Sequence, residues 1–294
     1  MAFPPEVEWT NRMQIGSAEH KELFCRSFID SHEPYDPREL PWPQLDETSL
    51  SILRSIPIWS MALQVEVNAG ATLEEFAKSQ PDPLIQQALR LQGFEEDRHG
   101  RMLGELVARY GLDGRAEPAA PYGGRQAFID FGYNECLDSF AGFGVFRIAR
   151  QVRFLPEELT ALFSRVLYEE ARHIVFFVNW IGYERCVRGY GAPLLQIVPT
   201  AIGYVRALRK TVGRAGAANT SDKGMAAAGD VFKDLTLQKF IQAALDENDM
   251  HMATFDPRLL RPRVIPTLAK FVLNAANAID WTKRSVRAFA SASK

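Results

Sequence analysis

The sequence carries one five-residue pattern, Glu-Glu-x-Arg-His, twice: at residues 95–99 and again 74 positions later at residues 169–173. Each copy lies in a stretch whose apolar residues recur with the spacing of an amphipathic helix. Each copy also falls in the second helix of a predicted helical hairpin. Because two hairpins of the same design pack readily against each other, the repeat predicts a pseudo-symmetric bundle of helices.

Four long helices are predicted around this repeat, at residues 46–79, 83–110, 125–152 and 156–188. Cap residues mark several of their ends. Asp46 opens the first helix, Asp82 and Pro83 open the second, and Gly111 closes the second. We expect Pro57 to bend the first helix without ending it.

The remaining sequence is also helical in pattern. Three further helices are predicted, at residues 193–212, 230–255 and 265–289. The small residues at positions 213–229 are typical of a flexible loop. No segment alternates apolar and polar residues over a useful length, so the predicted fold class is all-α.

We expect one overall domain with three parts. Residues 1–45, rich in Pro and charge, form an N-terminal arm that Trp9 and Trp42 anchor. Residues 46–190 form the four-helix bundle. Residues 191–294 add helices that pack on the bundle.

Composition excludes several classes of protein. The chain of 294 residues has a net charge of −2, so nothing indicates a basic nucleic-acid surface. Its three cysteines form neither a Cys-x-x-Cys pair nor a disulfide framework, which favours a reducing cytoplasm. We expect no signal peptide and no membrane span, because the sequence lacks the apolar runs that both require.

The repeated pattern places a carboxylate and an imidazole on one helical face, since Glu96 and His99 are three residues apart, as are Glu170 and His173. That combination suits a first-row metal ion such as iron, manganese or zinc. Each pair supplies only two ligands, so further carboxylates must come from the other helices. Glu66 is the natural partner of Glu96, because both lie fifteen residues from the turn near position 81.

The third helix offers two candidates for the last ligand. Glu135 lies nineteen residues before the second turn and Asp138 sixteen, against sixteen after the turn for Glu170. Asp138 matches the height better, whereas glutamate reaches further and can bridge two ions. We therefore predict Glu135 as the ligand and keep Asp138 as the alternative. The aromatic and aliphatic residues around these acids make them costly to bury unless a cation neutralises them.

These residues resemble the ferritin-like di-iron carboxylate superfamily, whose pattern is Glu followed about thirty residues later by Glu-x-x-His, and then the same again. The resemblance covers roughly residues 47–189. It implies a ferritin-like four-helix bundle, with Glu96 and Glu170 as shared carboxylates. The implied metal ligands are Glu66, Glu96, His99, Glu135, Glu170 and His173.

One branch of this superfamily, the small subunit of ribonucleotide reductase, binds a ligand histidine through the acid that precedes the second motif's glutamate. Glu169 holds that position, and Glu95 holds the matching one in the first repeat. The alternative is that both acids face solvent and pair with Arg98 and Arg172. The chain departs from the arylamine N-oxygenase branch, because Val166 stands where that branch has a third histidine. It also lacks the cysteine pairs of rubrerythrins, and it is much longer than ferritin shell subunits.

A second Glu/His pair, Glu247 and His251, lies on a later predicted helix. Residues four apart on a helix share a face. This spacing fits a metal site and an ordinary surface contact equally well. We favour the surface contact.

The resemblance implies a dioxygen-activating oxidase or oxygenase with two iron ions, although a mixed manganese–iron pair uses nearly the same ligands. We expect a small, fairly apolar organic substrate and an electron donor. The oligomeric state stays open, with a homodimer as the default for such proteins. One alternative is iron handling, as ferroxidase, storage or peroxide detoxification. Another is a metal-free helical interaction protein whose Glu and His residues lie on solvated faces.

Overall fold

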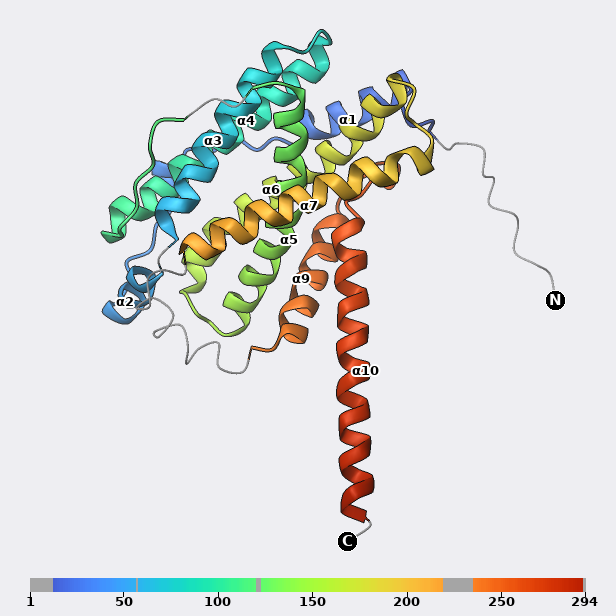
Figure 1. Ribbon diagram of the computed structural model, residues 1–294. Coiled ribbons are helices and arrows are strands. Elements are labelled where there is room, and N and C mark those ends of the chain that lie inside the picture. The colour runs from blue at the N-terminus through green and yellow to red at the C-terminus, as the bar shows by residue number, and fades with distance from the viewer. Residues whose placement is uncertain (1–12, 57, 120–122, 219–234, 293–294) are drawn as a thin grey trace, which may run out of the picture.

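The computed structural model describes residues 13–56, 58–119, 123–218 and 235–292. Throughout these residues the regular structure is helical, with no strand, so the all-α prediction is confirmed (Figure 1). Trp9, predicted to anchor the N-terminal arm, lies outside the described residues.

Two antiparallel helical hairpins form the centre of the molecule. Helices α3 (Trp59–Lys78) and α4 (Pro83–Tyr110) make the first, and α5 (Arg125–Gln151) and α6 (Glu157–Val187) make the second. The hairpins meet where α3 packs on α5 and α4 packs on α6. A Cβ atom added at Gly70 would lie 2.4 Å from Asp97 Oδ1. Glycine therefore permits the close approach of α3 to α4 beside the repeated motif.

The ends of α4 follow the predicted caps. The Asp82 carboxylate accepts hydrogen bonds from the N–H groups of Leu84 and Ile85, with Pro83 as the first helical residue. Gly111 ends the helix with φ at 60°, a left-handed conformation that glycine adopts without steric cost. Helix α6 begins after Pro156 with no side-chain cap.

The first predicted helix is wrong in one respect. Instead of one bent helix over residues 46–79, the chain forms α2 (Glu47–Ser55) and then α3. Ile56 is extended, with φ −82° and ψ 114°, the conformation that a following proline imposes. Pro57 itself lies outside the described residues.

The later helices also differ from their predicted bounds. Helix α7 (Pro193–Ala218) continues through residues 213–218, which were predicted to be a flexible loop; the rest of that predicted loop lies outside the described residues. Helix α9 (Leu237–Met252) begins later than predicted, and positions 230–234 lie outside the described residues. The last helix, α10 (Val264–Ala292), agrees with the prediction within three residues at each end.

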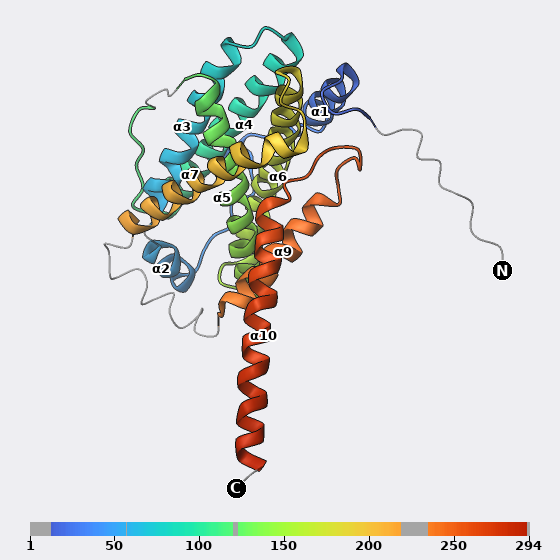
Figure 2. The same ribbon diagram turned by 45° about the vertical axis from the view of Figure 1, so that its right-hand side comes forward.

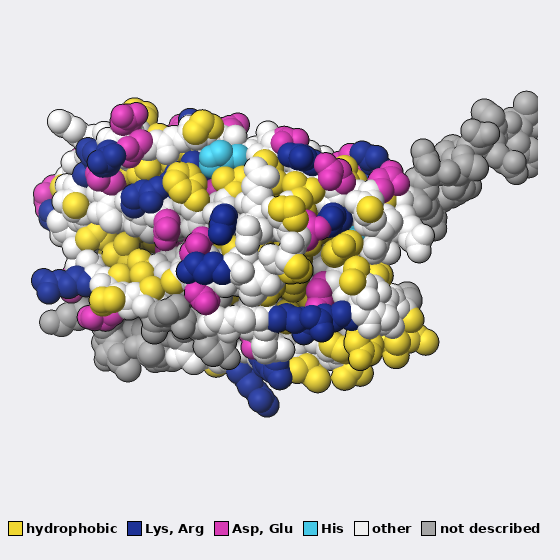
Figure 3. Space-filling view, turned by 90° about the horizontal axis from the view of Figure 1, so that it is seen from above, with side chains coloured by type: hydrophobic (Ala, Val, Ile, Leu, Met, Phe, Trp, Pro, Cys, Tyr) yellow, Lys and Arg dark blue, Asp and Glu magenta, His cyan; other side chains and the backbone are white. Residues whose placement is uncertain are grey.

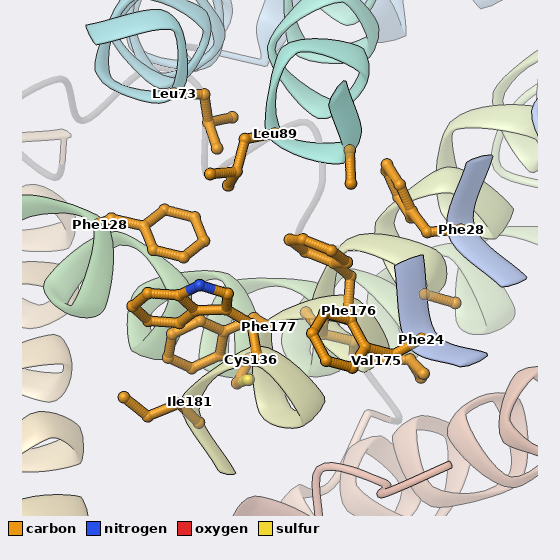
Figure 4. Close-up of a cluster of buried hydrophobic side chains, with 14 of the residues drawn as sticks. Phe24, Phe28, Leu73, Leu89, Phe128, Cys136, Val175, Phe176, Phe177 and Ile181 are labelled. Carbon is orange, nitrogen blue, oxygen red and sulfur yellow. The ribbon is translucent and has the colours of Figure 1, made fainter. Parts of the chain in front are cut away.

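The N-terminal segment belongs to the body. Helix α1 (Ala18–Asp30) packs on α6 and α4, and its residue Cys25 enters the main hydrophobic core. Phe24 and Phe28 of the same helix enter this core as well (Figure 4). After the short helix η1 (Pro37–Glu39), the ring of Trp42 packs edge-on against Tyr110. Trp42 is thus one of the two anchors that the sequence predicts.

Three helices cover α5 or extend from it. Helices α7 and α9 pack on α5, and α10 packs on α9 before it projects beyond the body (Figures 1 and 2). In the described part of the chain, no helix combines the length and the hydropathy of a membrane span.

Candidate metal centre

All six predicted ligand residues meet between the two hairpins. Helix α3 supplies Glu66 and α5 supplies Glu135, while the repeated motifs on α4 and α6 supply a Glu and a His each. Their ligand atoms form two groups, each with every atom within 4.8 Å of the others, and Glu96 belongs to both. The groups are Glu66, Glu96, His99 and Glu170, and Glu96, Glu135 and His173.

Glu135 joins this cluster and Asp138 does not. The Asp138 carboxylate instead accepts a hydrogen bond of 2.9 Å from the Thr211 hydroxyl of α7. Two residues three apart on a helix differ in direction by about 60°, so one can enter the bundle while the other faces the covering helix. Ser139 adds a contact that the sequence analysis missed, since its hydroxyl donates to Glu170 Oε2 at 3.2 Å.

The inward atoms of the cluster suit a metal ion. Glu96 Oε1, His99 Nδ1 and His173 Nδ1 are all buried, and none makes a hydrogen bond. Nevertheless, His173 Nδ1 lies 3.0 Å from Glu96 Oε1, and His99 Nδ1 lies 3.2 Å from Glu170 Oε1. Buried polar atoms without hydrogen bonds are costly. Donor atoms that crowd together without bonding one another are the arrangement that a shared cation stabilises.

The outward nitrogen of each histidine binds the acid of the opposite motif. His99 Nε2 lies 2.8 Å from Glu169 Oε2, and His173 Nε2 lies 2.9 Å from Glu95 Oε2. When Nε2–H donates to the carboxylate, the lone pair of neutral imidazole stays on Nδ1, which faces the cluster. The two motifs therefore orient each other's histidine, and the hydrogen bonds expected of Glu95 and Glu169 are present.

Two buried arginines hold these outer carboxylates. Arg98 donates to Glu169 Oε1 at 2.6 Å, and Arg172 donates to Glu95 Oε1 at 2.7 Å. Both arginines and both glutamates are buried. The alternative in which Glu95 and Glu169 face solvent is therefore wrong, although its pairing of these acids with the motif arginines is correct.

The N-terminal segment completes this outer layer. His32 Nδ1 lies 2.6 Å from Glu95 Oε1, and the Tyr35 hydroxyl donates to Glu169 Oε2 at 3.3 Å. The Arg98 guanidinium lies over the Tyr35 ring, 3.9 Å from its centre, and Arg172 donates to Ser31 Oγ at 2.9 Å. No motif in the sequence predicts these residues. Each lies more than sixty positions from its partner, so no local pattern connects them.

Burial and neighbouring charge shift the pKa values of the cluster in opposite directions. Burial raises the pKa of Glu66 to about 8, and burial together with nearby carboxylates raises the pKa of Glu135 well above its usual value. Burial alone would raise the pKa of Glu96, but the two histidines hold that pKa below its usual range. Burial alone would lower the pKa of His173, but Glu96 and Glu95 raise it to about 10. The four carboxylates of the cluster therefore carry more negative charge than its two histidines can neutralise.

Two cavities border the cluster from different sides. One, of about 240 Å³, reaches Glu66 and His99 and is otherwise lined almost wholly by apolar side chains, among them Trp59, Leu103 and Phe163. The Thr160 hydroxyl at its wall is already hydrogen-bonded to a backbone carbonyl of its own helix. The other cavity, of about 450 Å³, lies between α3, α5 and α7. It reaches Glu135 and is lined in part by Asp130, Asn134, Asp138 and Lys210.

The second Glu/His pair lies elsewhere and is not a surface pair. Glu247 is fully buried and ion-paired with Arg147 and Arg150 of α5. The ring of His251 stacks on Phe143, with ring centres 4.8 Å apart. Two guanidinium groups already neutralise the Glu247 carboxylate, so these residues join α9 to α5 and are not arranged to hold a cation.

No family model matches the chain, and neither the search of curated proteins nor that of solved structures finds a match.

Proposed function

We propose that this chain is a dioxygen-activating non-haem di-iron oxidase or oxygenase that acts on a small, fairly apolar organic substrate. In this proposal α3, α4, α5 and α6 are a ferritin-like four-helix bundle. Insertion of one oxygen atom into a substrate C–H bond reduces the other to water and consumes two protons and two electrons. An external donor supplies those electrons in the cytoplasm, where the free cysteines stay reduced.

The observation that carries the proposal is the convergence of four carboxylates and two imidazoles. Among their atoms, Glu96 Oε1 and the Nδ1 atoms of both histidines are buried and lack hydrogen bonds. One ion would be held by Glu66, His99 and Glu170 and the other by Glu135 and His173, with Glu96 shared. Two ferrous ions bound there supply the electrons and the open coordination positions that dioxygen reduction needs. A manganese–iron pair would suit the same residues.

The outer residues keep the ligands in place and in the right protonation state. Glu169 and Glu95 hold each histidine with Nδ1 directed inward. Burial alone would raise the pKa of Glu95, but His173 and Arg172 lower it to about 2. Arg98 forms a buried ion pair with Glu169. The N-terminal segment covers these pairs from outside, so water has little access to the histidines.

The apolar cavity favours oxidation of an organic substrate over iron handling. It ends at Glu66 and His99 and offers no free charged group other than the cluster itself. An apolar ligand would gain from burial there, whereas a ferroxidase has no use for such a cavity. A cavity of about 240 Å³ suits a compound the size of a single aromatic ring with a short substituent.

Anaerobic loading with Fe(II), followed by rapid mixing with oxygenated buffer, tests this proposal. We expect two iron ions per chain, a transient optical signal, and oxygen consumption that small alkylbenzenes stimulate with formation of a hydroxylated product. Glu96→Ala should lose both the signal and the product. Rapid Fe(II) oxidation without any product from the alkylbenzenes, and with iron accumulating beyond two per chain, would instead support iron handling. Absence of bound metal would leave a helical interaction protein.

A further inference from the structure

Helix α7 presents a long apolar face to solvent. Its inner side packs on α5, where Ala207 is buried and the ring of Tyr204 lies against Tyr133. On its remaining surface eight large apolar side chains are between 46% and 80% exposed. They are Leu194, Leu195, Ile197, Val198, Ile202, Val205, Leu208 and Val212. Figure 3 shows hydrophobic side chains gathered along its lower right edge, on the side of the molecule that α7 covers in Figure 1.

This face is too large for an ordinary solvent-exposed surface. Half-exposed aliphatic side chains each leave roughly 100 Å² in water, so the eight together offer about 800 Å². The largest apolar patch on a typical monomer is about 300–600 Å². An area of about 800 Å² per partner is what a stable protein interface of standard size buries.

Helix α10 presents a second uncovered apolar surface. Between Asn274 and Trp281 its described side chains are exposed, apart from the partly exposed Ala276. Phe271 is 72% exposed and Trp281 is 71% exposed. Figures 1 and 2 both show the helix projecting beyond the body of the molecule, where no other described part of the chain covers it.

The pattern along α7 indicates that a helix covers it. Outward positions 194, 198, 201, 205, 208 and 212 are all apolar and are separated alternately by four and three residues. That is the spacing of the seam along which two helices of a coiled coil interdigitate.

Charge disfavours a lipid surface as the occupant. Helices that lie on anionic membranes present basic side chains beside the apolar face. Here Arg206 pairs with Asp130 and Lys270 with Asp249, while Lys210 borders the cavity that contains Asp130 and Asp138. Arg206 and Lys270 are therefore paired with acidic groups of their own chain, and Lys210 lies beside two more, which leaves Arg209 as the remaining exposed cation on α7 between Pro193 and Val212.

We propose that the outward faces of α7 and α10 form the interface between two copies of this chain. A two-fold axis brings the same faces of both copies together, so one contact covers both α7 faces. Each projecting α10 then extends past its own body and packs on the other copy. This inference does not depend on the metal centre.

Sedimentation velocity of the full-length protein over micromolar concentrations tests the proposal. We expect a species of twice the 33.1 kDa chain mass. The double variant Val198→Asp with Val205→Asp should weaken association at least about 100-fold, because dimerisation would bury two carboxylates in an apolar seam. Phe271→Glu on α10 should weaken it independently. Val145→Asp, on a 53% exposed residue of α5, is the matched control and should leave the dimer intact.

Circular dichroism and thermal unfolding establish whether each variant is folded. If the α7 double variant does not fold, the effect of Phe271→Glu on association tests the proposed interface. A dimer that survives both the α7 and the α10 substitutions would overturn the assignment of the interface. A wild-type monomer would overturn the proposal as a whole. Binding of that monomer to vesicles containing phosphatidylglycerol would then assign the faces to a lipid surface.

Discussion

The two halves of the centre carry the same motif but border different surroundings. Around His99 and around His173 the outer bonds are equivalent: a glutamate of the opposite motif, held in turn by a buried arginine. Beyond these bonds the halves diverge. The half with Glu66 and His99 opens on an apolar cavity, whereas Glu135 borders a cavity with several acidic groups. In the proposed function, the repeat supplies the residues that would hold the metal ions. The difference between the halves would set the direction from which an apolar substrate arrives.

The largest effect is expected where the halves join. Glu96 belongs to both ligand groups, so Glu96→Ala should weaken the binding of both ions by more than about 100-fold, beyond the 10–100-fold typical of an outer contact. Anaerobic Fe(II) titration measures this. Glu105→Ala, a change of the same size at a partly exposed residue of α4, should still bind two ions. If Glu96→Ala lost only one ion, the two halves would be independent sites.

The second substitution separates one half from the other. Glu135→Ala should reduce iron binding from two ions per chain to one, because only the group with His173 contains Glu135. Asp138→Ala, three residues later on the same helix, should retain both ions, since its carboxylate bonds Thr211 of α7. Elemental analysis after iron loading distinguishes the two variants. Loss of one ion from Asp138→Ala but not from Glu135→Ala would make Asp138 the ligand.

A matched pair of substitutions tests whether the two histidine–glutamate hydrogen bonds are equivalent. Glu95→Gln and Glu169→Gln should each lower iron affinity by about 10–100-fold, because each removes the carboxylate that orients one histidine. Competition with a chelator gives the two affinities. A large loss for one variant and none for the other would mean that the motifs are alike in sequence but not in role.

The cavities are compared by filling each with the same residue. Val166→Phe narrows the apolar cavity and should lower turnover of a small alkylbenzene by about 10-fold or more, with two ions still bound. Val65→Phe narrows the other cavity and should change turnover little. Product formation at fixed iron loading measures both. Equal losses would show that substrate does not arrive through one cavity alone.

The smallest effect concerns how the two motif helices begin. Partial burial alone would raise the pKa of Asp82, but the Lys21 ammonium and two N–H groups of α4 lower it. Asp82→Ala should therefore cost about 1 kcal/mol at pH 7. Because the folded pKa is depressed, this contribution is present above the unfolded pKa near 4 and is lost as pH falls through the folded value. Urea unfolding of the metal-free protein at pH 7 and pH 3 measures it. Pro156→Ala, at the uncapped start of α6, should show no such pH dependence.

Much of the helical bundle could be predicted from the sequence because helices depend on local signals. Apolar periodicity located α4, α5 and α6, and Asp82 and Gly111 marked both ends of α4. Pro57 was assigned a bend where the chain has a break, because the strength of a proline's effect depends on the packing around it.

The candidate site was predictable only where its residues follow the repeat. Glu96, His99, Glu170 and His173 share a helical face by spacing alone, and hairpin symmetry located Glu66. Height along the helix does not decide whether Glu135 or Asp138 is the ligand, because that depends on how α5 is rotated about its axis relative to α7. The contacts of His32, Ser31 and Tyr35 join distant segments, and burial of Glu247 depends on two arginines nearly one hundred residues away. Such contacts follow from tertiary packing and leave no local pattern.

The proposed function requires six side chains from the two hairpins to hold a pair of metal ions. A crystal structure of the iron-loaded protein, with anomalous diffraction measured on either side of the iron absorption edge, tests this most directly. We expect two anomalous peaks enclosed by the six predicted ligand residues, with His99 and His173 bonded through Nδ1. Iron bound elsewhere on the chain, or no peak among these residues, would contradict it.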